Sequence, residues 1–210
     1  MELGDCEPAD AIRLSGANGA GRVVRLSPAA AAYIMADTLP DIIAERLTVL
    51  FCGLNPGMKA AATGHHFAGR GNRFWRVVHL AGFTPEEFAP QTDRIILQHG
   101  CGLTSVVERP TARADQLSPQ EFVAVAAEFE RKIAQYAPRF VAFLGKAAYC
   151  TLSGRPDVAW GLQSATMAGS TIWVLPNPSG RNRAFTLDQL VGAYRELHAA
   201  AFKARPSLSC

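Results

Sequence analysis

Two asparagine–proline pairs stand directly after apolar segments and are the residues of this sequence best placed to do chemistry. The first lies within Gly53-Leu54-Asn55-Pro56-Gly57 and the second is Asn177-Pro178. Proline lacks a backbone donor and biases the residue before it away from the helical region, so each asparagine is held at a corner. An amide can orient a water molecule through its oxygen but cannot accept a proton. It therefore suits positioning rather than general-base chemistry.

Each corner follows an expected strand. Residues 47–52 and 171–175 are short apolar runs, which are typical of strands buried on both faces. Ligands bind beyond the carboxyl ends of strands in open α/β sheets, so the two corners could face each other across one crevice. The alternative interpretation is a pair of ordinary β-to-α turns.

The remaining pattern predicts an α/β fold. Further strands are expected at 101–107 and 139–144. Helices are expected at 72–82, 93–99, 119–136, from 145, and at 186–201. Strands that alternate with helices give a mainly parallel central sheet covered on both faces, which is a three-layer αβα sandwich. We expect one domain at 39–203, a loosely ordered N-terminal extension at 1–38 and a C-terminal tail at 204–210.

Composition narrows the class of protein without naming its function. The chain has 210 residues, of which 49% are apolar, and a net charge of +3. This length and composition suit a globular domain and exclude a disordered chain. The slight positive charge does not by itself separate a nucleic-acid binder from other enzymes.

The cysteines and the apolar runs predict neither a metal site nor a membrane span. The five cysteines are an odd number without a C-x-x-C pair, so they fit neither a disulfide framework nor zinc-finger spacing. We expect no metal and no cofactor. No run of 18 or more apolar residues is present, and the acidic N-terminus lacks the order of a signal peptide. A cytoplasmic location is expected.

Several segments together resemble the mismatch-specific uracil/thymine DNA glycosylases, the mismatch-uracil branch of the uracil-DNA glycosylase superfamily. They stand in the family's order and at its spacings between residues 47 and 200. The matching segments are 53–57, 63–75, 82–84, 144–146 and 175–180. The resemblance implies a uracil-DNA-glycosylase-like fold and a monofunctional glycosylase. Such an enzyme, acting as a monomer on double-stranded DNA, flips uracil out of a G·U mispair and hydrolyses its glycosidic bond. Thymine and exocyclic-adduct pyrimidines are further candidate bases, and the abasic product enters base-excision repair.

The resemblance also implies roles for individual residues. Asn55 would position the attacking water, and Phe67 would stack on the flipped base, although a core position is its alternative. Asn72 lies near the pocket in the family, although it could equally cap a helix. The expected residues of the base pocket, besides Asn55, are Gly53, Leu54, Pro56, Gly57, Ala60, Phe67 and Asn72.

The second corner matches the loop that enters the DNA and fills the place of the extracted base. Its residues are Asn177, Pro178, Ser179, Gly180, Arg181 and Arg183. Arg181 stands at the wedge position, where mismatch-uracil enzymes commonly have an apolar residue and thymine-type enzymes have Arg. Arg183 is expected to hold a phosphate.

Several alternatives stay open. The chain could be a non-catalytic module that senses damaged or mismatched DNA, or a hydrolase of free nucleosides. A carboxylate could assist Asn55, and the sequence does not rank the candidates Glu86, Glu87, Asp93 and Glu108. His65 and His66 are interpreted as exposed loop residues.

Overall fold

The computed structural model describes residues 11–14, 22–25, 39–108 and 119–202. The chain divides into two units, Met1–Asp37 and Thr38–Cys210. In the first unit, β1 (Ala11–Leu14) pairs antiparallel with β2 (Arg22–Arg25). The rest of the expected extension, and the expected tail at 204–210, lie outside the described residues.

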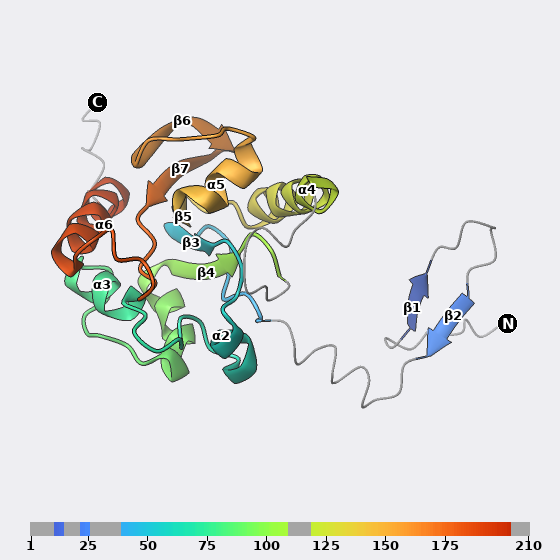
Figure 1. Cartoon of the computed structure of the whole chain (residues 1–210), viewed down its shortest axis with the longest axis horizontal. Helices are drawn as coiled ribbons and strands as arrows, with labels where there is room; N and C mark the ends of the chain where they lie inside the picture. The colour runs from blue at the N-terminus through green and yellow to red at the C-terminus, as the bar shows by residue number, and fades with distance from the viewer. Residues whose placement is uncertain (1–10, 15–21, 26–38, 109–118, 203–210) are drawn as a thin grey trace, which may run out of the picture. The chain divides into compact units, whose positions relative to one another are not determined.

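A five-stranded sheet forms the centre of the second unit (Figure 1). Its order is β4-β3-β5-β7-β6. The strands are β3 (Val49–Gly53), β4 (Cys101–Ser105), β5 (Phe140–Leu144), β6 (Gly161–Met167) and β7 (Ser170–Leu175). The first four in this order run parallel, and β6 pairs antiparallel with β7 at the edge. The predicted α/β class, with a mainly parallel central sheet, is confirmed.

Helices cover both faces of this sheet. They are α2 (Met58–Thr63), α3 (Phe74–Leu80), α4 (Pro119–Tyr136), α5 (Lys146–Ser153) and α6 (Leu187–Phe202), together with the 3-10 segment η1 (Pro90–His99). One core cluster packs the side chains of α3, η1 and α6 against residues such as Phe51 and Leu103. A second cluster packs α4 and α5 against residues such as Leu50 and Phe143 on the opposite face. The two clusters account for the three layers.

Two elements of the second unit are missing from the sequence expectation. Strand β6 is absent from it because alternate side chains of β6 are exposed, so the segment has no apolar run to predict a buried strand. Helix α2 occupies six residues for which the sequence predicts no element. Its Ala60 and Ala61 are buried, so the helix anchors the connection between β3 and α3.

Candidate active site

The first asparagine corner is fastened to the end of the neighbouring strand. The carbonyls of Gly53 and Leu54 accept hydrogen bonds from the amides of Val106 and Val107, each at 2.9 Å. Asn55 is half-buried, and its Nδ2 donates to the Pro56 carbonyl at 3.2 Å. The corner therefore has a fixed shape at the carboxyl end of β3.

The second corner is a turn closed by its own side chains. The Asn177 Oδ1 accepts from the Ser179 amide at 2.9 Å, and the Asn182 Nδ2 donates to the Asn177 carbonyl at 2.8 Å. Behind it, the buried Tyr194 hydroxyl donates to the Pro176 carbonyl at 3.3 Å. The polar groups of Asn177 thus form hydrogen bonds within the loop, whereas Arg181 in the same loop is exposed.

Both corners line one cleft of about 1130 Å³. Leu144, at the end of β5 between β3 and β7, lies in the same lining. The expectation that the corners face a common crevice is confirmed. Of the expected residues of the base pocket and the second loop, Pro178 alone is not in the lining and is buried instead. The others in the lining are Gly53, Leu54, Asn55, Pro56, Gly57, Ala60, Phe67, Asn72, Asn177, Ser179, Gly180, Arg181 and Arg183.

Phe67 lies both in the lining of the cleft and against the hydrophobic core, the two positions considered for it above. It is half-buried in the cleft lining, and its ring lies parallel to that of Phe74, with centroids 3.8 Å apart and an interplanar angle of 19°. Its φ of +58° is rare for a bulky residue, so the surroundings hold this ring in place. The core therefore fixes the ring at the edge of the cleft.

Asn72 also serves two environments. Its Oδ1 accepts a hydrogen bond from the Phe74 amide at 3.0 Å, just before α3 begins, and the residue lines the cleft. This bond satisfies one of the amides that a helix start leaves unpaired.

The charge lining the cleft is positive. Among the described residues in the lining there is no Asp or Glu, whereas the cations are Lys59, Arg70, Arg73, Arg181 and Arg183. Such a surface attracts phosphate groups and stabilises a departing anion. None of the four carboxylates considered above lines the cleft.

One carboxylate behind the lining was missed in the sequence. The Thr104 hydroxyl donates to Asp41 Oδ1 at 2.8 Å, and Lys132 Nζ lies 2.7 Å from Asp41 Oδ2. Burial alone would lower the pKa of Lys132, but the hydrogen bonds and charges of Asp41 and Glu108 raise it. No sequence signal joins these residues, because they lie on three segments far apart in the chain.

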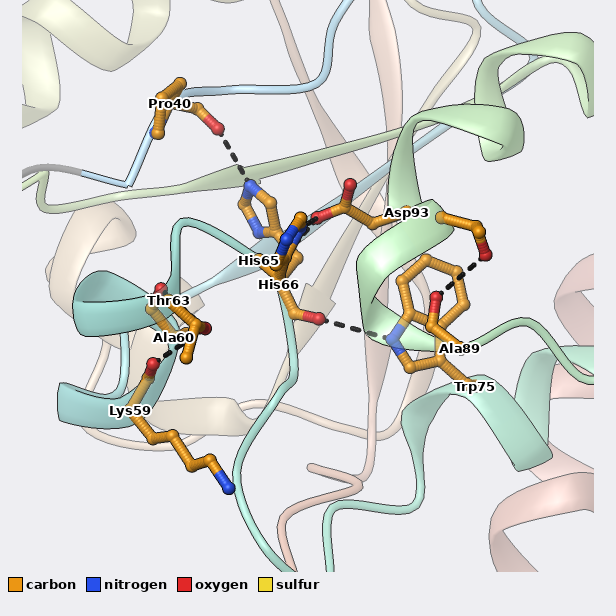
Figure 2. A network of polar contacts seen from close by, with 10 residues as sticks. Pro40, Lys59, Ala60, Thr63, His65, His66, Trp75, Ala89 and Asp93 are labelled. Carbon is orange, nitrogen blue, oxygen red and sulfur yellow. Dashed lines mark hydrogen bonds and ion pairs between the residues drawn. The ribbon is translucent and has the colours of Figure 1, made fainter.

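The interpretation of His66 as an exposed loop residue is wrong. Its side chain is buried, with Nε2 2.9 Å from the Pro40 carbonyl, and its amide donates to Asp93 Oδ2 at 2.9 Å (Figure 2). The Trp75 indole donates to the His66 carbonyl at 3.2 Å. Burial lowers the pKa of His66. Next to it, His65 is half-buried, and its Nδ1 lies 3.6 Å from Asp93 Oδ2.

The part of the chain that the structure describes contains neither a candidate metal-binding cluster nor a candidate membrane-spanning helix. Across residues 39–108 and 119–202, no group of three or more His, Cys, Asp or Glu side chains could hold a metal ion. No helix in these ranges combines the length and the apolarity that a membrane span requires.

Comparison with known proteins adds two findings. A family model described as the uracil DNA glycosylase superfamily matches residues 40–198, which is most of the chain. The solution NMR structure of a protein from Methanosarcina acetivorans, provisionally named a uracil DNA glycosylase, is similar with a TM-score of 0.52. The match has 21% sequence identity and covers 78% of this chain and 98% of that chain. At this identity the structural similarity shows a shared fold.

Proposed function

Because the chain belongs to the uracil DNA glycosylase superfamily, we propose that it removes uracil from G·U mispairs in duplex DNA by hydrolysis. The superfamily match supports a DNA N-glycosylase. The preference for a mispair and the mechanism below are our proposal. We also propose thymine and exocyclic-adduct pyrimidines as further bases that the enzyme removes.

The observation that carries the proposal is the common cleft of the two asparagine corners. Asn55 and Phe67 line this cleft together with Arg181 and Arg183. A glycosylase has to accommodate an extracted base on one side and fill the hole in the duplex from the other. Two loops that line one basic cleft suit these two tasks.

In the proposed mechanism Asn55 positions the water that attacks the sugar. An amide oxygen accepts hydrogen bonds and can orient a water molecule, so we assign to Asn55 Oδ1 the bond to the water. An amide cannot take the proton, and no carboxylate stands among the described residues of the lining. The rate should therefore depend on positioning and on stabilisation of the departing base by donors and cations.

This mechanism favours bases that leave readily as anions. Uracil and its 5-substituted analogues are weakly basic leaving groups, so they should be cleaved faster than other pyrimidines. Phe67 would stack on the flipped base, and Arg181 would occupy the vacated position beside the opposite guanine. Arginine can fill space, stack and donate hydrogen bonds there.

The test is single-turnover strand cleavage after alkali treatment. The substrates are labelled duplexes that contain G·U, A·U or G·T, and single-stranded DNA that contains uracil. Asn55→Ala should slow cleavage of G·U by about a hundredfold or more. Gln98→Ala is a matched control, because Gln98 is an exposed amide outside the cleft lining, and it should act like the wild type.

The other outcomes separate the alternatives. Equal rates for wild type and Asn55→Ala would mean that another residue positions the water. Salt-sensitive binding of the G·U duplex without any cleavage would support a sensor of mismatched DNA. Release of uracil from free deoxyuridine, with no cleavage of DNA, would support a nucleoside hydrolase.

A further inference from the structure

Arg73 connects the start of α3 to almost the whole length of the second loop. Its Nη1 donates to the Phe185 carbonyl at 2.9 Å, and its Nη2 donates to the carbonyls of Asn182 at 2.8 Å and Ser179 at 3.2 Å. The Nε donates to the Pro178 carbonyl at 3.4 Å, and the Arg73 amide donates to the same carbonyl at 3.0 Å. One side chain thus binds four carbonyls of one loop.

Only arginine can make this set of contacts. Its guanidinium presents five donors in a rigid plane, whereas a lysine ammonium is a single point with three donors. The bonds are charge-assisted and therefore stronger than those between neutral groups. Arg73 is also half-buried, whereas Arg70 and Arg76 on either side of it in sequence are exposed.

A second contact joins the same two segments through their backbones. A Cβ built on Gly180 would lie 2.5 Å from the Gly71 carbonyl oxygen. The two segments therefore touch at a point where both residues are glycine and neither has a side chain. Gly71 and Arg73 follow Phe67 in the sequence, and Gly180 belongs to the second loop, to which we assign the contact with DNA. The two sides of the cleft are therefore held as one unit.

We propose that Arg73 is a positioning residue that holds the second loop in the form required to enter duplex DNA. This inference rests on the proposed function, because it assigns the loop the task of filling the hole left by the extracted base. A loop that is ordered before binding loses less conformational freedom when it inserts. Uracil in a single strand leaves no hole in a base stack, so its removal does not need the clamp.

The experiment compares Arg73→Lys and Arg73→Ala with Arg76→Lys and Arg76→Ala. Single-turnover rates are measured on a G·U duplex and on the single strand of the same sequence. Arg73→Lys keeps the charge and should lower the duplex rate on the order of tenfold or more, because small misplacements of reacting groups are costly. The single-strand rate should change by less than about threefold, and the Arg76 variants should leave the ratio of the two rates unchanged.

Hydrogen–deuterium exchange of the free protein gives a second readout that does not depend on cleavage. Arg73→Lys should increase exchange of the amides in residues 179–185 and leave those of the β-sheet unchanged. If the wild type cleaves neither substrate, the proposed function fails, and exchange still decides whether the clamp exists.

Three outcomes would overturn the inference. One is an equal loss on duplex and single strand in Arg73→Lys, which would indicate general damage. Another is an unchanged ratio of rates together with unchanged exchange. The third is increased exchange throughout the protein, which would make Arg73 a residue of overall stability.

Discussion

Gly180 and Gly71 touch backbone to backbone, from segments more than 100 residues apart, where a Cβ on Gly180 would lie 2.5 Å from the Gly71 carbonyl oxygen. Real Cβ atoms do not approach backbone oxygen so closely. Any side chain at position 180 must therefore push the second loop away from the rim of the cleft.

Gly180→Ala is expected to reduce cleavage of the G·U duplex on the order of tenfold, because the added methyl group displaces the backbone that carries Arg181. Gly192→Ala is the matched control, since a Cβ at this position in α6 meets nothing within 4 Å. That control should keep its activity and gain up to about 1 kcal/mol of stability from helix propensity. Rates and thermal melts of both variants decide the matter, and an active Gly180→Ala enzyme would contradict the prediction.

Phe67→Leu should weaken cleavage because it removes the aromatic face that we assign to the flipped base. Stacking of a base on an aromatic ring contributes about 1–3 kcal/mol. This corresponds to a loss of roughly 5- to 150-fold in kcat/KM. Phe67→Tyr keeps the ring and should retain most of the activity. Equal losses in the two variants, measured by single-turnover rates over a range of enzyme concentrations, would remove stacking as the explanation.

Arg183→Gln tests the expected phosphate contact. Loss of one such contact should reduce the slope of log binding constant against log salt concentration by about 0.9. Fluorescence anisotropy with a G·U duplex between low and moderate salt measures this slope. Arg155→Gln, a change to an exposed arginine outside the cleft lining, should leave it unaltered. An unchanged slope in Arg183→Gln would show that Arg183 does not hold a phosphate.

The buried His66 should make the protein less stable in mild acid. Burial lowers the pKa of His66 below its usual 6.5, and the nearby Pro40 carbonyl, Asp93 and Asp41 offset this only in part. Between pH 6.5 and the lower pKa of the folded state, the unfolded chain binds more protons, so the free energy of unfolding falls as the pH falls.

His66→Gln should therefore flatten the dependence of stability on pH below about 6.5, where one such group contributes at most about 1.4 kcal/mol per pH unit. Denaturant unfolding at several pH values measures this. His198→Gln is the comparison, because burial also lowers the pKa of His198 but that residue is more exposed. Identical slopes for His66→Gln and the wild type would refute the assignment.

The ion pair of Lys132 and Asp41 should contribute more to stability than the pair of Lys146 and Asp157. Both pairs have nitrogen–oxygen distances of 2.7 Å, but the side chains of the first are only 16% and 21% exposed. Lys132→Met should cost about 1–3 kcal/mol because it leaves Asp41 without its cation in a partly dry site. Lys146→Met should cost less, since water already surrounds that pair. Equal losses in denaturant unfolding would contradict this order.

The features that the sequence predicts well are those that neighbouring residues determine. Asn55-Pro56 and Asn177-Pro178 are corners because proline restricts its own φ and the residue before it. The predicted strands at 139–144 and 171–175 agree with β5 and β7 to within one residue at each end. Their apolar runs suit burial on both faces.

The features that the sequence does not reveal depend on distant partners. His66 is buried because Pro40 and Asp93, which are 26 and 27 residues away, supply its hydrogen bonds. Arg73 looks like one more cation near the first corner until its partners, 105 to 112 residues away, are known. Strand β6 exists because β7 offers it an edge, since its own residues have no continuous apolar face.

The order of the sheet also limits how enzymes of this architecture can diversify. The two corners follow β3 and β7, and β5 alone separates these strands. Neighbouring strands lie about 4.8 Å apart, so the roots of the two loops stand roughly 10 Å apart whatever side chains they carry. Exchanging these loops between relatives, or lengthening them by engineering, therefore leaves the distance between their roots unchanged. Changes in the preferred base would then arise from the composition of two short segments, while the backbone keeps their separation constant.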